Sequence, residues 1–167
     1  MWSLAVRGTA AVASVDRVSE LSLVDWRVRV ADLYAQVRAD DDPARAHATW
    51  RAGRDRLFRE HPQSPLPAHD PLRETGLPVW EYDPAWRFEL PRGGGLDVWS
   101  LHQYGDGLFV PVKDAKGAWL GGSDDAVVVD LNFAYHPSCR YDPRWRCPLA
   151  PPGNVLDVEV RAGERLP

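Results

Sequence analysis

The sequence predicts an α+β domain in which two N-terminal helices pack on an antiparallel β-sheet. Apolar side chains before residue 61 recur at helical spacing, whereas after residue 78 they alternate with a period of two in short segments. Parallel pairing of such segments would require crossovers of about a dozen residues or more, and the intervals are mostly turns. The strand lengths leave open whether the sheet closes into a barrel or splits into a sandwich.

The first helix is expected from residue 22 to about residue 38. Ser22 followed by Asp25 has the form of a capping pair at its start. The apolar side chains that follow at near-helical spacing predict one core-facing side: Trp26, Val30, Leu33 and Val37.

The second helix is expected from Pro43 to about Glu60, with Asp42 as its cap. Pro62 cannot continue it. Its core-facing side chains are expected to be Ala46, Trp50, Leu57 and Phe58.

Strands are expected after a proline-rich connection at residues 61–78. Alternating Trp86, Phe88 and Leu90 predict the first strand, and the three glycines at 93–95 predict a chain reversal. Further strands are expected at residues 96–102, 108–112, 126–134 and 155–161.

A chain of 167 residues is long enough for one domain with a substantial core. We expect a weakly ordered tail at residues 1–21 and a single globular domain at residues 22–167. Within it, residues 62–167 are expected to be mainly β and residues 22–61 helical.

Charge and hydropathy exclude several classes of function. The formal net charge of −4 argues against a nucleic-acid partner. No apolar run approaches the ~20 residues that span a bilayer, so no membrane partner is expected. Arg7 breaks the apolar region that a signal peptide would need, so we expect a cytoplasmic protein. The sequence does not determine the oligomeric state.

The two cysteines, Cys139 and Cys147, permit three interpretations. With His136 nearby they could hold zinc, but their separation differs from the usual two-to-four-residue spacing, so no metal is expected. A disulfide between them is geometrically open if the loop doubles back. In a reducing cytoplasm both are thiols by default. No phosphate loop or other nucleotide motif is present in the sequence, and no cofactor is expected.

The candidate site lies at the end of the strand expected at 126–134 and in the loop after it. Asp130 and Asn132 would share one strand face. The loop is rich in proline but carries aromatic side chains, which favours an ordered structure. The predicted ligand-binding residues are Asp130, Asn132, Tyr135, Cys139, Arg140, Tyr141 and Asn154. No catalytic residue is predicted.

Two functions remain open. In the first, the domain binds or acts on a small molecule at this site. In the second, it is a non-enzymatic interaction or scaffold module in which the loop only caps the sheet. The first predicts a pocket floored by Asp130 and Asn132, and the second predicts broad packing of Tyr135, Tyr141 and Trp145.

Three segments resemble a known family: WRAGRDRLFREHPQSPL at 50–66, GLPVWEYDPAWRF at 76–88 and DLNFAYHPSCRYDPRWRCPLAPPGNVLDVEVRAGE at 130–164. The chain is similar to bacterial and archaeal proteins grouped as domain of unknown function 1684, over residues 24–164. The resemblance implies kinship without a reaction. Where the family has a segment resembling TYGGGRYL, this chain has KDAKGAWLGGSDD at 113–125. If that segment helps to form the family's site, this chain is a shortened or inactive relative.

Overall fold

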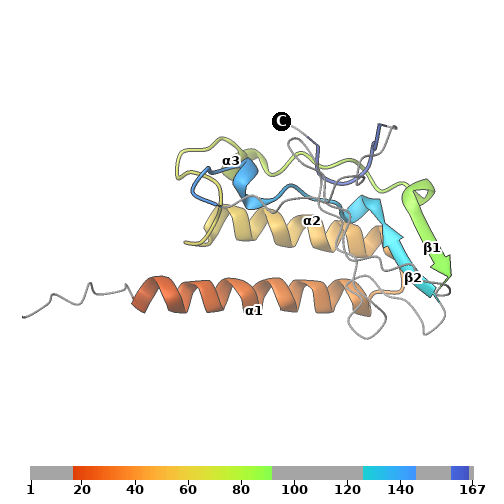
Figure 1. Cartoon of the computed structure of the whole chain (residues 1–167), viewed down its shortest axis with the longest axis horizontal. Helices are drawn as coiled ribbons and strands as arrows, with labels where there is room; N and C mark the ends of the chain where they lie inside the picture. The colour runs from red at the N-terminus through yellow and green to blue at the C-terminus, as the bar shows by residue number, and fades with distance from the viewer. Residues whose placement is uncertain (1–16, 92–125, 146–158, 166–167) are drawn as a thin grey trace, which may run out of the picture.

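The computed structural model describes residues 17–91, 126–145 and 159–165. Two long helices, α1 (Arg17–Ala39) and α2 (Pro43–Glu60), lie side by side in opposite directions, as Figure 1 shows. A short helix, α3 (Leu72–Thr75), precedes two strands, β1 (Arg87–Pro91) and β2 (Ala126–Asp130). The strands pair antiparallel, which confirms the predicted α+β class. The described residues form a two-stranded sheet that does not close into a barrel.

Helix α1 begins five residues before the predicted cap, so the prediction of a start at Ser22 was wrong. The Ser22 hydroxyl accepts a hydrogen bond from Gln63 Nε2 at 2.7 Å and therefore serves a tertiary contact. Leu33 and Val37 are buried as predicted, together with Tyr34. Neither this helix nor any other described one is long and apolar enough to cross a membrane.

Helix α2 begins and ends as predicted. The Asp42 carboxylate accepts hydrogen bonds from the backbone N–H groups of Ala44 and Arg45, at 2.9 and 3.2 Å. Within the helix, the side chain of Leu33 from α1 packs directly over Gly53, where a Cβ would displace it. The four predicted core residues are buried, and so is His47, which the apolar pattern could not indicate.

The proline-rich connection at 61–78 wraps around the end of α2 and is held there by Arg73. The Arg73 guanidinium donates hydrogen bonds to three backbone carbonyls, those of Arg59 and Leu66 at 2.7 Å and of Pro67 at 2.9 Å. Satisfying several carbonyls at once compensates for a segment whose prolines supply few backbone donors. Arg73 is thus one of the side chains that order the connection.

The strand expected at 126–134 ends at Asp130, and the prediction that it continues was wrong. The Asp130 carboxylate accepts the backbone N–H of Asn132 at 3.0 Å and caps a single 3-10 turn, η2 (Leu131–Phe133). Register pairs Arg87 with Asp130 at the end of the ladder. The first predicted strand likewise begins one residue late, because Trp86 belongs to the turn η1 (Pro84–Trp86).

Residues 159–161 are irregular rather than a strand, although Val160 is half-buried between exposed Glu159 and Arg161, as the alternation predicted. After them the chain enters the interior. Gly163 accepts from Trp80 N–H at 2.9 Å, and Glu164 N–H donates to Ala134 at 2.8 Å. The predicted strands at 96–102 and 108–112, the glycines at 93–95 and residues 155–158 lie outside the described residues.

Candidate functional site

Asn132, a predicted site residue, lies in η2 with no exposed surface. Its side-chain oxygen accepts the Asp83 backbone N–H at 2.9 Å. Its Nδ2 donates to the Asp83 carbonyl and to Asp130 Oδ1, both at 2.8 Å. The side-chain amide of Asn132 therefore bonds both the N–H and the C=O of Asp83, as the backbone of a paired strand would. All hydrogen-bonding atoms of the amide are engaged.

Asp130 is fully buried beside it. While Oδ1 binds Asn132, Oδ2 lies 3.5 Å from the Arg87 guanidinium and accepts the Tyr82 hydroxyl at 3.4 Å. Burial, together with the negative charge of Asp130, raises the pKa of Tyr82 to about 12, so this phenol stays protonated at neutral pH. The structure thus brings Asp130 and Asn132 together, as predicted, through a turn rather than along a strand face.

His47 connects this polar cluster to α2. Its ring packs among Trp50, Tyr82 and Phe133, with centroid distances of 5.5, 5.7 and 5.4 Å. Burial lowers the pKa of His47, while a hydrogen bond from the ring to the Asn132 backbone opposes this. The other ring nitrogen, Nε2, is buried and has no hydrogen-bond partner among the described residues. A buried polar atom of this kind requires an explanation.

His47 also lines a hollow of about 430 Å³ between α2 and the segment at 81–82. On its rim Arg51 pairs with Glu81 at 3.3 Å, and both side chains are exposed. Asp55 accepts the backbone N–H of Leu77 at 2.9 Å and so is already engaged. The full lining is Ala44, His47, Ala48, Arg51, Ala52, Asp55, Glu81 and Tyr82.

The loop after β2 packs against α2 instead of surrounding the Asp130–Asn132 pair. The Tyr135 ring lies 4.8 Å from the Arg54 guanidinium, and the Tyr141 ring meets Phe58 at 5.5 Å. Burial raises the pKa of Tyr135. These contacts leave the two tyrosines apart from the hollow beside His47.

The remaining predicted residues are dispersed. Cys139 is half-buried and Arg140 exposed, both in the turn η3 (Ser138–Arg140). Asn154, Cys147 and the altered interval at 113–125 lie outside the described residues, so the disulfide and the effect of that interval stay predictions. In the described part of the chain, no cluster of three or more histidine, cysteine or acidic side chains could hold a metal ion.

A buried ion pair that the sequence did not indicate joins Arg54 to Glu164. Arg54 donates to Glu164 Oε2 at 2.8 Å, and the two side chains are only 12% and 1% exposed. The same oxygen accepts the backbone N–H of His136 at 3.1 Å. The guanidinium also lies over the rings of Trp50 and Phe58, at 5.3 and 4.8 Å. A contact between residues 110 positions apart leaves no local sequence signal.

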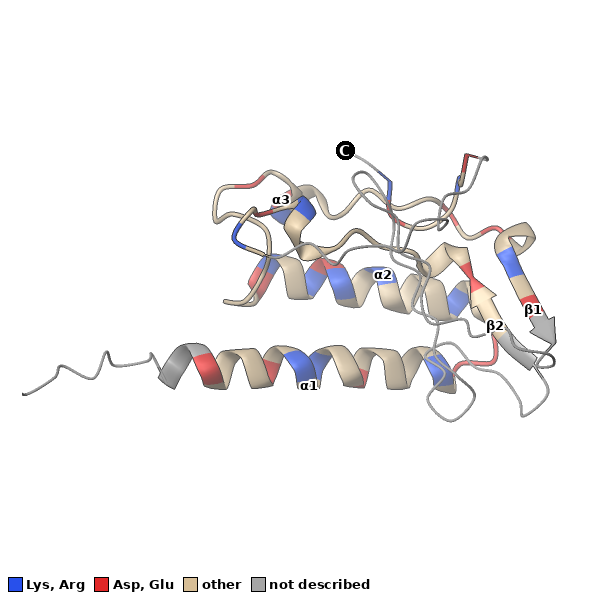
Figure 2. Cartoon of the chain, viewed as in Figure 1, with Lys and Arg blue, Asp and Glu red and all other residues tan. Residues whose placement is uncertain are grey.

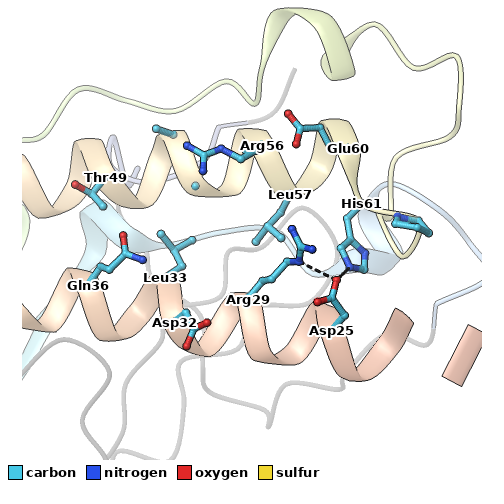
Figure 3. A pocket seen from close by; sticks show the side chains of 13 residues that line it. Asp25, Arg29, Asp32, Leu33, Gln36, Thr49, Arg56, Leu57, Glu60 and His61 are labelled. Atoms are coloured by element: carbon cyan, nitrogen blue, oxygen red, sulfur yellow. Dashed lines mark hydrogen bonds and ion pairs between the residues drawn. The ribbon is translucent and has the colours of Figure 1, made fainter. Parts of the chain in front are cut away.

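A second hollow, a groove of about 680 Å³, lies between α1 and α2 (Figure 3). At one end Asp25 is bonded to His61 at 3.0 Å and to Arg29 at 2.8 Å, and these bonds lower its pKa. Leu33 and Leu57 extend into the groove from the two helices, as Figure 3 shows. At that end of the groove Asp25, Arg29 and His61 are thus bonded to one another, whereas His47 Nε2 has no partner among the described residues.

The fold and the buried cluster define a small α+β domain whose polar residues join β2 to the segment before β1. The family model described as "Protein of unknown function (DUF1684)" matches residues 87–165. These residues, which include Asp130 and Asn132, form a domain of unknown function 1684, and the predicted family is confirmed. A comparison with curated proteins gives no match.

Proposed function

We propose that the protein is a binding domain for a small polar molecule that carries a hydroxyl or amino group. The ligand lies in the hollow between α2 and the segment at 81–82, next to the cluster formed by Asp130 and Asn132. The observation that carries this proposal is His47, which lines that hollow and whose buried Nε2 has no partner among the described residues. Pockets of a few hundred cubic ångströms with a few convergent polar groups are the usual form of such sites.

The chemistry follows from the tautomer of His47. Because Nε2 has no partner, the bond to the Asn132 backbone comes from Nδ1, whose N–H donates to the carbonyl. Burial keeps the ring neutral by lowering its pKa, so Nε2 is a hydrogen-bond acceptor. An unsatisfied buried acceptor costs about 1–3 kcal/mol, which a donating ligand group would recover. Nε2 is covered in the free protein, so a side chain beside the hollow must move for the ligand to reach it.

Asp130 and Asn132 act in this proposal as positioning residues. Asn132 holds the His47 ring through its carbonyl, and Asp130 accepts the hydroxyl of Tyr82. Direct ligand contact by the other predicted residues stays a prediction: Tyr135, Cys139, Arg140, Tyr141 and Asn154.

The second candidate, an interaction or scaffold module, is favoured by a different observation. Every hydrogen-bonding atom of the Asn132 side chain is engaged within the chain, and Tyr135 and Tyr141 pack on α2. That is the packing expected of a loop that caps the fold. In this case the hollow beside His47 has no ligand.

A thermal-shift screen of small hydroxylated and amino compounds, followed by calorimetric titration of the hits, tests the first proposal. Hits should stabilise the wild type and lose their effect in His47→Phe, which keeps a ring but removes Nε2. His47→Asn, which retains a donor for the Asn132 carbonyl, should behave in the same way. His69→Phe, at an exposed histidine, is the matched control and should bind as the wild type does. Hits that bind both His47 variants undiminished would refute the site, and a screen without hits would favour the scaffold module.

A further inference from the structure

The outer face of α1 carries an exposed apolar stripe. Leu21, Val24 and Val28 are 70%, 56% and 51% exposed, which is unusual for large apolar side chains on one helix face. Two exposed alanines continue the stripe along the same face. We call this stripe the outer seam: Leu21, Val24, Val28, Ala31 and Ala35. Its members are separated by three and four residues in turn, which is the spacing of a coiled-coil seam.

The opposite face of α1 is already occupied. Leu33, Tyr34 and Val37 are buried in the core that α1 forms with α2. Figure 1 shows α2 and α3 on one side of α1. A helix that is apolar on two faces is normally covered on both, and a contiguous exposed apolar patch marks an interaction site. Among the residues that the structure describes, nothing covers this second face of α1, and a second copy of the chain would cover it.

Figure 2 shows acidic and basic residues distributed along α1. Two of the charged residues lie beside the outer seam. Asp32 follows Ala31 on one flank, and Arg27 precedes Val28 on the other. In a parallel coiled coil, the residue that immediately precedes the first seam position of a heptad, here Arg27 before Val28, faces the residue five positions further along the partner helix. Arg27 of one copy would therefore face Asp32 of a second copy, and the two-fold symmetry repeats the pair.

Neither Arg27 nor Asp32 makes an ion pair within the described part of the chain, although Asp32 also lines the groove between α1 and α2. An antiparallel arrangement would set Arg27 against Arg27 instead. The parallel register also sets Glu20 opposite Asp25, which is unfavourable. Asp25, however, is already bonded to His61 and Arg29, so this repulsion is partly neutralised.

We propose that two copies of the protein associate in parallel through the outer seams of their α1 helices, with Arg27 of each copy facing Asp32 of the other. The seam spans only two heptads and ends in two alanines, so the dimer dissociates on dilution. This association is independent of ligand binding at His47, which lies on α2.

Sedimentation velocity of the full chain over a concentration series tests the association. The wild type should shift from monomer to dimer as concentration rises, whereas Val28→Asp should remain a monomer throughout. Ala68→Asp, which adds the same charge at an exposed position that lines neither hollow, should dimerise as the wild type does. Circular dichroism checks that each variant is folded. A wild type that stays monomeric, or a Val28→Asp variant that dimerises normally, would overturn the proposal.

Charge exchange tests the orientation. Arg27→Asp and Asp32→Arg should each weaken dimerisation roughly tenfold at low salt, because each turns two attractions into repulsions. Mixing the two variants restores both attractions, so the mixture should form a heterodimer at least as tight as the wild-type dimer. Arg27→Gln should weaken the parallel dimer but would relieve the Arg27–Arg27 repulsion of an antiparallel one. A stronger Arg27→Gln homodimer would therefore indicate antiparallel helices, and unchanged association in all variants would remove the charge argument. Either result overturns the parallel arrangement.

Discussion

Replacing Asn132 by Ala removes three hydrogen bonds from the interior at once. The side chain is fully buried and bonds the N–H and C=O of Asp83 and one oxygen of Asp130. Each bond contributes about 0.5–1.5 kcal/mol net, so the sum is roughly 1.5–4.5 kcal/mol. Asp83 is exposed, and water can replace part of the loss there. We therefore expect Asn132→Ala to lose about 2–3 kcal/mol of unfolding free energy, or roughly 5–10 °C in Tm.

Urea unfolding followed by tryptophan fluorescence measures this loss. Asn132→Asp is the matched variant, since it keeps the shape but sets a second carboxylate beside Asp130. It should be less stable than Asn132→Ala at neutral pH and regain stability as the pH is lowered toward the carboxylate range. Gln36→Ala, at an exposed position of α1, should change stability by under about 0.5 kcal/mol. A loss just as small for Asn132→Ala would show that the amide does not join the two segments, and would refute the reasoning.

Three further predictions concern the glycines, the buried ion pair and His47. Gly163→Ala should lower the free energy of unfolding by more than about 3 kcal/mol, because φ is +72° and the new Cβ would lie 2.5 Å from a backbone oxygen. Gly76→Ala, with φ +81° but only a side chain nearby, should lower it less in the same urea assay. Glu164→Gln should lower the free energy of unfolding by about 3–5 kcal/mol, because it leaves buried Arg54 without its counter-charge. The double variant Arg54→Met with Glu164→Leu, which replaces both charges by apolar side chains, should lower it less. Equal losses would contradict this reasoning. Burial lowers the pKa of His47 below its ordinary 6.5, so the unfolded chain takes up this proton first as pH falls. The stability that comes from the neutral His47 ring is therefore fully present above about pH 6.5 and is lost as the pH falls. Tm should decline between pH 7 and 5, and the slope should be smaller in His47→Phe. An unchanged slope would assign the decline to other groups.

Much of the helical part could be predicted because its signals act locally. Asp42 followed by Pro43 starts α2 through contacts within three residues, and Pro62 prevents its continuation. The apolar spacing of α1 identified its buried face correctly. The start of α1 was predicted wrongly because Ser22, which has the form of a cap, bonds Gln63 across a separation of 41 residues.

The site was predictable only in part. The side chains of Asp130 and Asn132 were expected to share a strand face, and they are hydrogen-bonded to each other across a turn instead. The alternating pattern could not show that Asp130 ends the strand by capping that turn. Nor could it show that Asn132 faces the backbone of Asp83, since nothing in either residue's neighbourhood specifies the other. His47 was overlooked because a single histidine on a helix has no periodic signal.

By itself, then, the sequence determined the α+β class, the family and the bounds of α2, because composition, apolar period and capping chemistry depend on neighbours in the chain. Only the tertiary structure decided which polar groups are buried and what they meet. Glu164 reaches Arg54 from 110 residues away, and His47 Nε2 is left without a partner by the packing of three aromatic rings. Such contacts arise from the burial of the chain as a whole, where each polar atom must find a partner or lose stability.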